Sequence, residues 1–167
     1  RAMDDVGVDS IETAVSVATA MDGGLISWGD GKAVLEIVKD IAKPTPLARL
    51  IAGGCAIVGK VCGLYRTPVV KDQAIPAYDP RSVKGIGLTY ATSPMGADHT
   101  AGYCISGNIL KVGANIDPLK KEGQIEYSRA MQIGTAAVDS TGMCLFVYFG
   151  IADSPAGYQA LIDMINA

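Results

Sequence analysis

The sequence predicts an all-α protein of about six helices, joined by irregular connections rich in Gly and Pro. Apolar residues recur three and four positions apart along most of the chain, which is the spacing of one helix face. Several of these runs begin with a capping residue, and Pro twice follows it at the first helical position. The chain has 167 residues, enough to bury a core.

The first predicted helix begins after Asp9, whose side chain can cap it. Glu12 stands three residues later and completes the pattern of a capping box, in which each side chain bonds the other residue's backbone. The apolar face of this helix comprises Ile11, Ala14, Val15, Ala18 and Met21. Gly23 and Gly24 are expected to end it.

Two further helices are predicted between Asp30 and Val58. The second helix starts near Asp30 and stops at Pro44, which cannot continue a helix. The third follows Thr45, with Pro46 at its first position, and is interrupted at residues 53–54 by two glycines.

The middle of the chain is predicted to be mostly irregular. Three prolines between Thr67 and Arg81 indicate a loop with at most one short strand. A small, Gly-bearing helix is expected over residues 82–92, and residues 95–115 are expected to be Gly-rich and irregular.

Two helices are predicted in the last third of the chain. Asp117 is expected to cap a long helix that has Pro118 at its first position and runs to about Val138. The last helix is expected to start at residues 154–155 and to reach Ile165.

Composition excludes several classes of partner. The net charge is −3, and no basic stripe with interleaved aromatic residues occurs, which argues against nucleic acid or an anionic membrane surface. A membrane-spanning helix needs about 20 apolar residues, and the uncharged run over residues 140–152 is shorter and contains Gly and Ser. Apolar residues make up 49% of the chain, so we expect this piece to pack against more protein.

The start of the chain predicts a fragment of a larger protein. It begins at Arg1, without an initiating Met and without a secretory leader. The spacing of Cys55, Cys62, Cys104 and Cys144 matches no zinc pattern. Disulfides are not expected without a secretory signal, so we expect a reducing, cytoplasmic compartment.

A short motif occurs twice, near the two ends of the chain. Residues 4–9 read Asp-Asp-Val-Gly-Val-Asp, and residues 139–144 read Asp-Ser-Thr-Gly-Met-Cys. Both follow the pattern D-x-x-G, then an apolar residue, then Asp or Cys. The repeat predicts two similar clamps on two similar halves of one ligand.

A longer signature lies between the two hexapeptides. It comprises Ile75–Arg81 (IPAYDPR), Lys84–Leu88 (KGIGL), Tyr90–Ser93 (YATS) and Gly96–His99 (GADH). Together with the hexapeptides, in the same order and spacing, this signature resembles the aldehyde ferredoxin oxidoreductase family, which are tungsten enzymes with a bis-pyranopterin cofactor. The resemblance spans essentially the whole chain. It implies that residues 1–167 cover much of the C-terminal α-helical cofactor-binding region of a larger tungstoenzyme.

The resemblance assigns one clamp to each pterin. Asp4, Val8 and Asp9 belong to the first clamp, and Asp139 and Met143 to the second. A carboxylate can accept two of the N–H donors of a pterin side by side. Gly at the fourth position lets the backbone approach a flat ring. The family has Leu where this chain has Val8 and Met143, and both substitutions keep an apolar contact.

The resemblance also implies a cluster ligand and an active-site residue. Cys144 is the fourth Cys ligand of a [4Fe–4S] cluster, because thiolate is the usual ligand of cluster iron. His99, the single histidine, matches the histidine near tungsten and is expected to hydrogen-bond or transfer a proton there or at the substrate carbonyl. The alternatives without a role in the site are that Cys144 is a buried cysteine, that His99 is structural, and that the aspartates of the hexapeptides are solvated or cap helices. Cys55, Cys62 and Cys104 are expected to be core residues.

The sequence departs from the family in two ways. Some members carry a basic residue two positions after the histidine, whereas residues 98–101 read Asp-His-Thr-Ala, which puts substrate preference in doubt. The family's C-x-x-C-x-x-x-C motif, its N-terminal β-rich domain and an upstream active-site glutamate do not occur in these 167 residues. The isolated chain is therefore expected to be inactive and to hold neither the tungsten (or molybdenum) cofactor nor the cluster.

Two functional hypotheses follow. In the first, the parent enzyme oxidises an aldehyde with water to a carboxylic acid and passes electrons through a [4Fe–4S] cluster to ferredoxin; a carboxylate-reducing direction stays open. In the second, the chain is a non-catalytic helical interaction module derived from the same family. A hydrolase is disfavoured because no G-x-S-x-G motif occurs.

Overall fold

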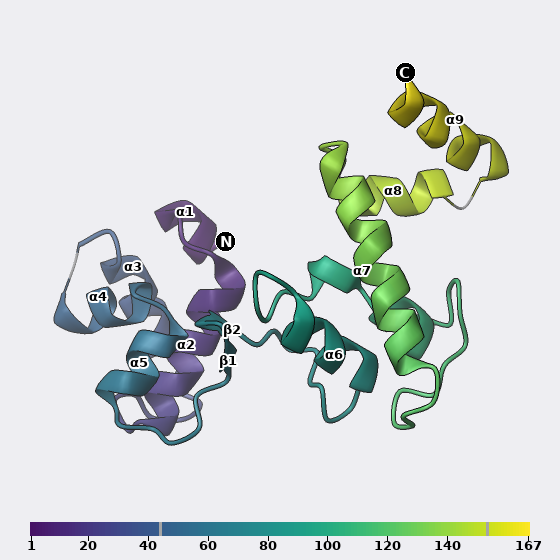
Figure 1. Cartoon of the computed structure of the whole chain (residues 1–167). Coiled ribbons are helices and arrows are strands. Elements are labelled where there is room, and N and C mark those ends of the chain that lie inside the picture. The colour runs from purple at the N-terminus through teal and green to yellow at the C-terminus, as the bar shows by residue number, and fades with distance from the viewer. Residues whose placement is uncertain (44, 153) are drawn as a thin grey trace. The chain divides into compact units, whose positions relative to one another are not determined.

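The computed structural model describes residues 1–43, 45–152 and 154–167, and these residues are mostly helical (Figure 1). They form nine α-helices, one 3₁₀ turn, one π-helical turn and one two-stranded hairpin. The predicted all-α class is confirmed, with more and shorter helices than expected. Pro44, predicted to stop the second helix, lies outside the described residues.

The chain divides into two compact units, which we describe separately. The first unit comprises residues 1–79 and 90–98, and the second comprises residues 80–89 and 99–167. The hexapeptide at residues 4–9 belongs to the first unit. The hexapeptide at residues 139–144 and His99 belong to the second unit.

The first unit is built from five helices and the hairpin. In chain order these are α1 (Ala2–Val6), α2 (Ser10–Asp22), α3 (Gly31–Asp40), α4 (Pro46–Ala52), α5 (Cys55–Val61), β1 (Val69–Val70) and β2 (Gln73–Ala74). Its core joins α2, α4 and α5 through Val17, Ala20, Ile51 and Val58, with Ile26 from the loop after α2.

Local capping chemistry determines where three of these helices begin. The side chain of each cap accepts the backbone N–H three residues on, at 2.6 Å for Asp9, 3.0 Å for Asp30 and 3.2 Å for Thr45. Pro46 occupies the first position of α4, where a missing N–H costs nothing. The three predicted helix starts, and the predicted cap at Asp9, are confirmed.

The structure gives Glu12 a different role from the predicted one. Its carboxylate accepts the N–H of Cys55 at 2.8 Å and the N–H of Ala74 at 2.9 Å. One oxygen thus satisfies the first turn of α5, and the other satisfies β2. The capping box that we predicted for α2 is half present: Asp9 caps the helix, but Glu12 ties α2 to two distant segments.

The predicted apolar face of α2 is wrong. Val17 and Ala20 reach the core, whereas Ile11 and Ala14 of the predicted face are exposed.

Two further predictions in the first unit need correction. The third helix is two helices, because Gly54 adopts φ +97° and ψ 161°, which no α-helix accommodates. The loop over residues 67–81 contains two strands rather than one at most, since β1 pairs antiparallel with β2. Lys71 and Asp72 form the two-residue turn with φ of 52° and 63°. This geometry usually takes Asn-Gly, so the sequence carried no clear hairpin signal.

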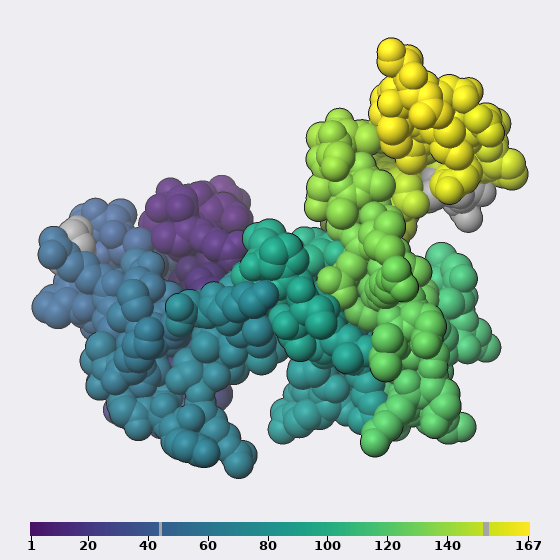
Figure 2. Space-filling model, viewed as in Figure 1, coloured from purple at the N-terminus to yellow at the C-terminus, as the bar shows by residue number. Residues whose placement is uncertain are grey.

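The second unit contains the helices that follow residue 99. They are η1 (Thr100–Gly102), the π-helical η2 (Ser106–Leu110), α7 (Gln124–Ser140), α8 (Leu145–Ala152) and α9 (Pro155–Asn166). α6 (Lys84–Thr92) begins two residues later than predicted, and its residues are shared between the units. α7 packs against η1, and α8 packs against α7 and α9. Figure 2 shows α9 in yellow at the end of the chain, beside α8.

The long helix α7 begins at Gln124, not at Asp117. Asp117 instead accepts the N–H of Leu119 at 3.0 Å in a short turn of its own. The buried side chain of Gln124 donates to the carbonyls of Asp117 and Lys120, at 2.7 and 3.0 Å. Gly123, at φ 75°, then turns the chain into the helix. Asp117 and Pro118 therefore belong to a turn that lies before α7, and not to its first helical turn.

Within the described residues, no single helix is both long and apolar enough to cross a membrane; α7 and α8 satisfy such a test only as a pair, by length and composition, across a bend of 104°.

Candidate functional site

The first hexapeptide forms the turn between α1 and α2 (Figure 1). Asp4 lies in α1, and Gly7 ends that helix in the left-handed conformation, with φ 75° and ψ 34°. Val8 donates its N–H to the carbonyl of Met3 at 3.1 Å, which completes a Schellman ending. Asp9 is then the N-cap of α2.

The second hexapeptide forms the turn between α7 and α8. Asp139 lies in the last turn of α7, and Gly142 adopts φ 73°. The Thr141 hydroxyl donates to the Val138 carbonyl at 2.6 Å. Cys144 immediately precedes α8, and its carbonyl accepts the N–H of Tyr148 at 3.1 Å.

The two turns share one local structure. In each, the glycine donates its N–H to the carbonyl of the aspartate three residues before it, at 3.1 Å for Gly7 and 3.0 Å for Gly142. In each, the last residue of the motif accepts the first backbone bond of the next helix. The sequence repeat is therefore also a repeat of helix end, left-handed glycine and helix start. Each of the two units contains one copy of the motif.

Both turns expose an acceptor beside an open stretch of backbone. The carboxylates of Asp4 and Asp139 are exposed. A Cβ added at Gly7 or Gly142 would meet no atom within 4 Å, so the space over each turn is open. The apolar residue of each motif is half-buried. Each turn thus combines an exposed carboxylate with uncovered backbone at the glycine, where a ligand can approach.

Cys144 differs from the other cysteines in its environment. It is exposed, whereas Cys55 and Cys104 are buried and Cys62 is half-buried against the core of the first unit. Burial raises the pKa of the Cys55 and Cys104 thiols above the usual value, so they stay protonated at neutral pH. Within the part of the chain that the structure describes, Cys144 is therefore not packed in a core. Among the described residues, no group of three or more His, Cys, Asp and Glu side chains is placed to hold a metal ion.

His99 is half-buried and lies beside an aromatic row that leads to α8. Its ring meets Tyr103 edge-on, with centroids 6.1 Å apart and an interplanar angle of 62°. Tyr103 in turn contacts Phe149, at 6.2 Å between centroids. Phe149 belongs to α8, the helix that Cys144 precedes. The second unit therefore brings His99 and the second hexapeptide toward the same helix.

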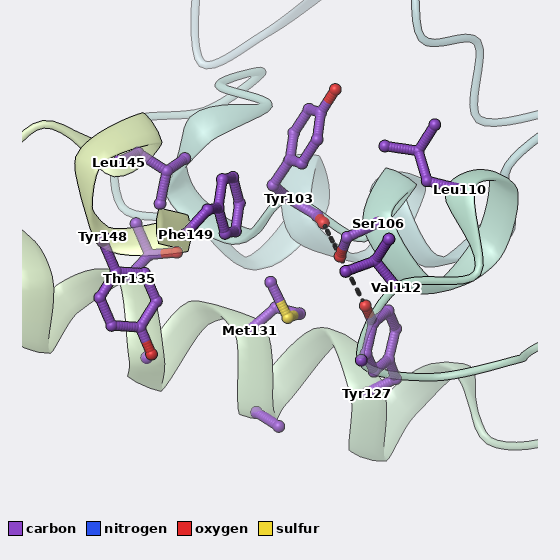
Figure 3. A pocket seen from close by; sticks show the side chains of 13 residues that line it. Tyr103, Ser106, Leu110, Val112, Tyr127, Met131, Thr135, Leu145, Tyr148 and Phe149 are labelled. Atoms are coloured by element: carbon purple, nitrogen blue, oxygen red, sulfur yellow. Dashed lines mark hydrogen bonds between the residues drawn. The ribbon is translucent and has the colours of Figure 1, made fainter. Parts of the chain in front are cut away.

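A pocket of about 580 Å³ opens in the second unit next to this row (Figure 3). Its walls include Tyr103, Leu110, Tyr127, Met131, Leu145 and Phe149. These residues were not predicted as a site, because neither a helix over residues 145–152 nor helical turns over residues 100–110 were expected from the sequence. One signal was available: Tyr127, Met131 and Thr135 recur every four residues, on one face of a helix.

Comparison with known proteins gives one consistent result. Residues 1–167 match the family described as aldehyde ferredoxin oxidoreductase, domains 2 & 3. The chain is 32% identical to the tungsten-containing aldehyde ferredoxin oxidoreductases of Pyrococcus horikoshii and Pyrococcus furiosus, and 30% identical to that of Thermococcus kodakarensis. Each match covers 98% of this chain and 29% of the relative. The chain therefore spans less than a third of the length of these relatives.

Proposed function

Because this chain belongs to the aldehyde ferredoxin oxidoreductase family, we propose that it is the pterin-holding part of a tungsten-dependent aldehyde:ferredoxin oxidoreductase. The whole protein oxidises an aldehyde with water to a carboxylic acid, releasing two electrons and two protons. The electrons leave through a [4Fe–4S] cluster to ferredoxin. The observation that carries the proposal is the pair of turns with one local structure, since a cofactor with two pterins needs two similar sites.

The residues of both turns fit a pterin chemically. A pterin edge offers amino and ring N–H donors, and the exposed carboxylates of Asp4 and Asp139 are acceptors. The open space over Gly7 and Gly142 admits a flat ring against the backbone. The bound cofactor supplies the redox chemistry, and this chain binds and orients it. One oxygen of Asp9 caps α2, which leaves the second oxygen for a ligand.

Cys144 fits the role of one ligand to an iron–sulfur cluster. Its thiol is exposed, as a surface ligand must be, and it follows directly on the turn assigned to a pterin. The buried thiols of Cys55 and Cys104 cannot share a surface cluster with it. A ligand at this place keeps the electron path from the pterin to the cluster short.

His99 fits a role at the aldehyde. An imidazole can hold or move a proton at the carbonyl oxygen of the substrate. The edge-on packing against Tyr103 restricts the orientation of its ring.

The proposal is tested on the full-length parent protein, expressed anaerobically. We expect bound tungsten, or molybdenum in its place, and aldehyde-dependent reduction of benzyl viologen. Asp4→Asn and Asp139→Asn replace an acceptor oxygen with an amide and should each lower tungsten content about tenfold or more, by analogy with other lost metal-site partners. Asp22→Asn, an exposed acid at the end of α2 outside both motifs, is the matched control and should leave it unchanged.

A fully assembled parent protein that contains neither metal would overturn the proposal. So would Asn variants of Asp4 and Asp139 that retain the metal as the control does. Tungsten content separates binding from catalysis, because it is measured without any substrate.

A further inference from the structure

We propose that Thr89 is a positioning residue for His99. Its buried hydroxyl holds η1 against α7, and η1 begins directly after His99. The inference rests on the proposed function, in which His99 acts at the aldehyde, and it names the group that sets the orientation of the histidine ring. Thr89, His99, η1 and α7 all belong to the second unit.

Thr89 is part of a chain of hydrogen bonds that starts on α7. The side-chain amide of Gln132 donates to the Ser128 hydroxyl at 3.2 Å, and the hydroxyls of Ser128 and Thr89 are 3.0 Å apart. Thr89 donates to the carbonyl of Gly102 at 3.0 Å, whereas the carbonyl of Gly85 lies farther away, at 3.5 Å. Because a hydroxyl has a single proton, Ser128 is the donor to Thr89. Each group therefore donates to the next, from α7 through α6 to the last residue of η1.

Burial makes this chain of hydrogen bonds sensitive to the loss of one member. Thr89 is fully buried and Ser128 is 2% exposed, so water does not replace a missing partner. Hydrogen bonds in such a chain also strengthen one another. The N–H of Cys104 donates to the Gly102 carbonyl as well, at 2.7 Å, but this local bond does not tie the turn to another helix. The Thr89 hydroxyl supplies that connection.

Gly102 lies against α7 without room for a side chain. A Cβ added to it would be 2.7 Å from Cγ of Gln132 and 3.2 Å from the hydroxyl oxygen of Thr89. The end of η1 is therefore held at one residue by close packing on α7 and by a hydrogen bond from α6.

The position of Gly102 determines the surroundings of His99 in two ways. His99 is the N-cap of η1, so one 3₁₀ turn of backbone connects it to Gly102. Tyr103 directly follows Gly102, and its ring meets the His99 ring edge-on, with centroids 6.1 Å apart. The backbone and the aromatic neighbour of His99 thus both depend on where the Thr89 hydroxyl holds the turn. We expect the imidazole to lose its orientation when that hydroxyl is removed.

The test uses the full-length tungsten-loaded parent, with kcat and KM for acetaldehyde measured per bound tungsten and benzyl viologen as the electron acceptor. Thr89→Val removes the hydroxyl and keeps the branched shape. It should lower kcat about tenfold and leave KM nearly unchanged, because a misplaced ring loses an interaction made in the transition state. Thr89→Ser keeps the hydroxyl and should retain kcat within about twofold of the unmodified enzyme.

Thr19→Val is the matched control. Thr19 is also a buried threonine, and its hydroxyl donates to the carbonyl of Val15 at 2.8 Å and lies 3.1 Å from the sulfur of Cys55. Thr89 has the same kind of surroundings, with the sulfur of Cys104 at 3.6 Å. Thr19 belongs to the first unit, however. The control should therefore lose stability as Thr89→Val does and keep the kcat of the unmodified enzyme.

A double-mutant cycle separates positioning from a general loss of stability. His99→Gln removes the imidazole and should lower kcat about 100-fold or more. In that background Thr89→Val should change kcat by less than about twofold, because no ring is left to orient. If Thr89→Val lowers kcat by the same factor in both backgrounds, its role is structural and the inference is wrong.

Hydrogen exchange followed by mass spectrometry gives a readout that needs no turnover. Thr89→Val should speed the exchange of the amides of residues 100–104 about tenfold, and Thr19→Val should leave it unchanged. Ser128→Ala breaks the same chain one bond earlier and should change kcat and exchange in the same direction. It decides the question if Thr89→Val binds no tungsten.

Unchanged exchange or unchanged kcat in both Thr89→Val and Ser128→Ala would overturn the inference alone, provided that His99→Gln lowers kcat. A parent that contains no tungsten or molybdenum refutes the proposed function, and the inference with it. If His99→Gln keeps the full kcat of a metal-loaded parent, the role of His99 is refuted and so is its positioning by Thr89.

Discussion

At the scale of single residues, the half-buried carboxylate of Glu12 shows how one side chain joins distant parts of the chain. It accepts backbone N–H groups from α5 and from β2, 2.8 and 2.9 Å away. It also lies one turn after Asp9, whose side chain caps the same helix. Glu12 thereby holds the start of α2, and with it the turn assigned to a pterin, against the rest of the first unit.

Glu12→Gln should destabilise the chain by about 2 kcal/mol, because an amide presents N–H protons to one of two backbone donors. Urea unfolding measures the change in the free energy of unfolding. Glu36→Gln on α3 is the control, since Glu36 is exposed, and we expect a change of at most about 0.5 kcal/mol. Equal effects of the two substitutions would contradict the anchoring role.

The cysteines should separate by their reactivity toward iodoacetamide. Burial raises the pKa of the Cys55 and Cys104 thiols, so at pH 8 they hold less reactive thiolate than a thiol with the usual pKa. Exposed Cys144 should be alkylated first, and the two buried thiols about 100-fold more slowly, with a rate that rises only at higher pH. Mass spectrometry of the peptides follows each site. Rapid alkylation of Cys104 in the folded chain would show that its burial is wrong.

At the scale of elements, the two hexapeptides connect successive helices through a glycine that bends the chain. Both glycines occupy the left-handed region, at φ 75° and 73°. Side chains other than Gly are strained there, whereas Gly adopts this conformation freely. The same residue therefore makes the turn between the helices and leaves room for the flat ring that we propose to bind there.

Gly7→Ala and Gly142→Ala should each destabilise the chain by about 1 kcal/mol, since L-residues pay for positive φ. Gly134→Ala should instead stabilise it by roughly 0.5–1 kcal/mol, because Gly134 is an interior residue of α7 with open space at Cβ. Thermal unfolding of the three variants compares the signs. A destabilised Gly134→Ala would mean that α7 is not helical through this position.

At the scale of the whole molecule, the two hexapeptides that we propose as pterin sites lie in two different units, and the chain supplies one proposed cluster ligand, the exposed Cys144. Its relatives are more than three times as long as the matched segment. Complete assembly of the proposed cofactor and cluster thus belongs to the parent protein.

In the full-length parent, Cys144→Ser should abolish the visible absorbance and electron paramagnetic resonance signal of the [4Fe–4S] cluster, because an alcohol is a poor ligand for cluster iron. Tungsten content should fall much less, since Asp139 and Gly142 stay in place. Cys62→Ser, a half-buried cysteine outside the motif, is the control and should keep the cluster. An intact cluster in Cys144→Ser would remove Cys144 from the proposed ligand set.

The sequence by itself determined the class, several helix starts and the candidate residues. Asp9 caps α2 as predicted, and helices start at Asp30, Thr45 and Ser154 as predicted, because capping depends on residues within one turn of each other. The hexapeptides were visible for the same reason, since each is a local turn. Their assignment to pterins stays a prediction, as do the roles proposed for Cys144 and His99.

Only the tertiary structure decided which distant segments meet. Glu12 accepts hydrogen bonds from segments more than 40 residues away. The helix α7 begins at Gln124 rather than at Asp117, because the Gln124 side chain bonds the preceding turn. The pocket is lined by residues from three separate stretches of the chain. The burial of Cys104 and the exposure of Cys144 belong to the same category. Such features depend on packing between elements, and local propensity carries no information about which surfaces come together.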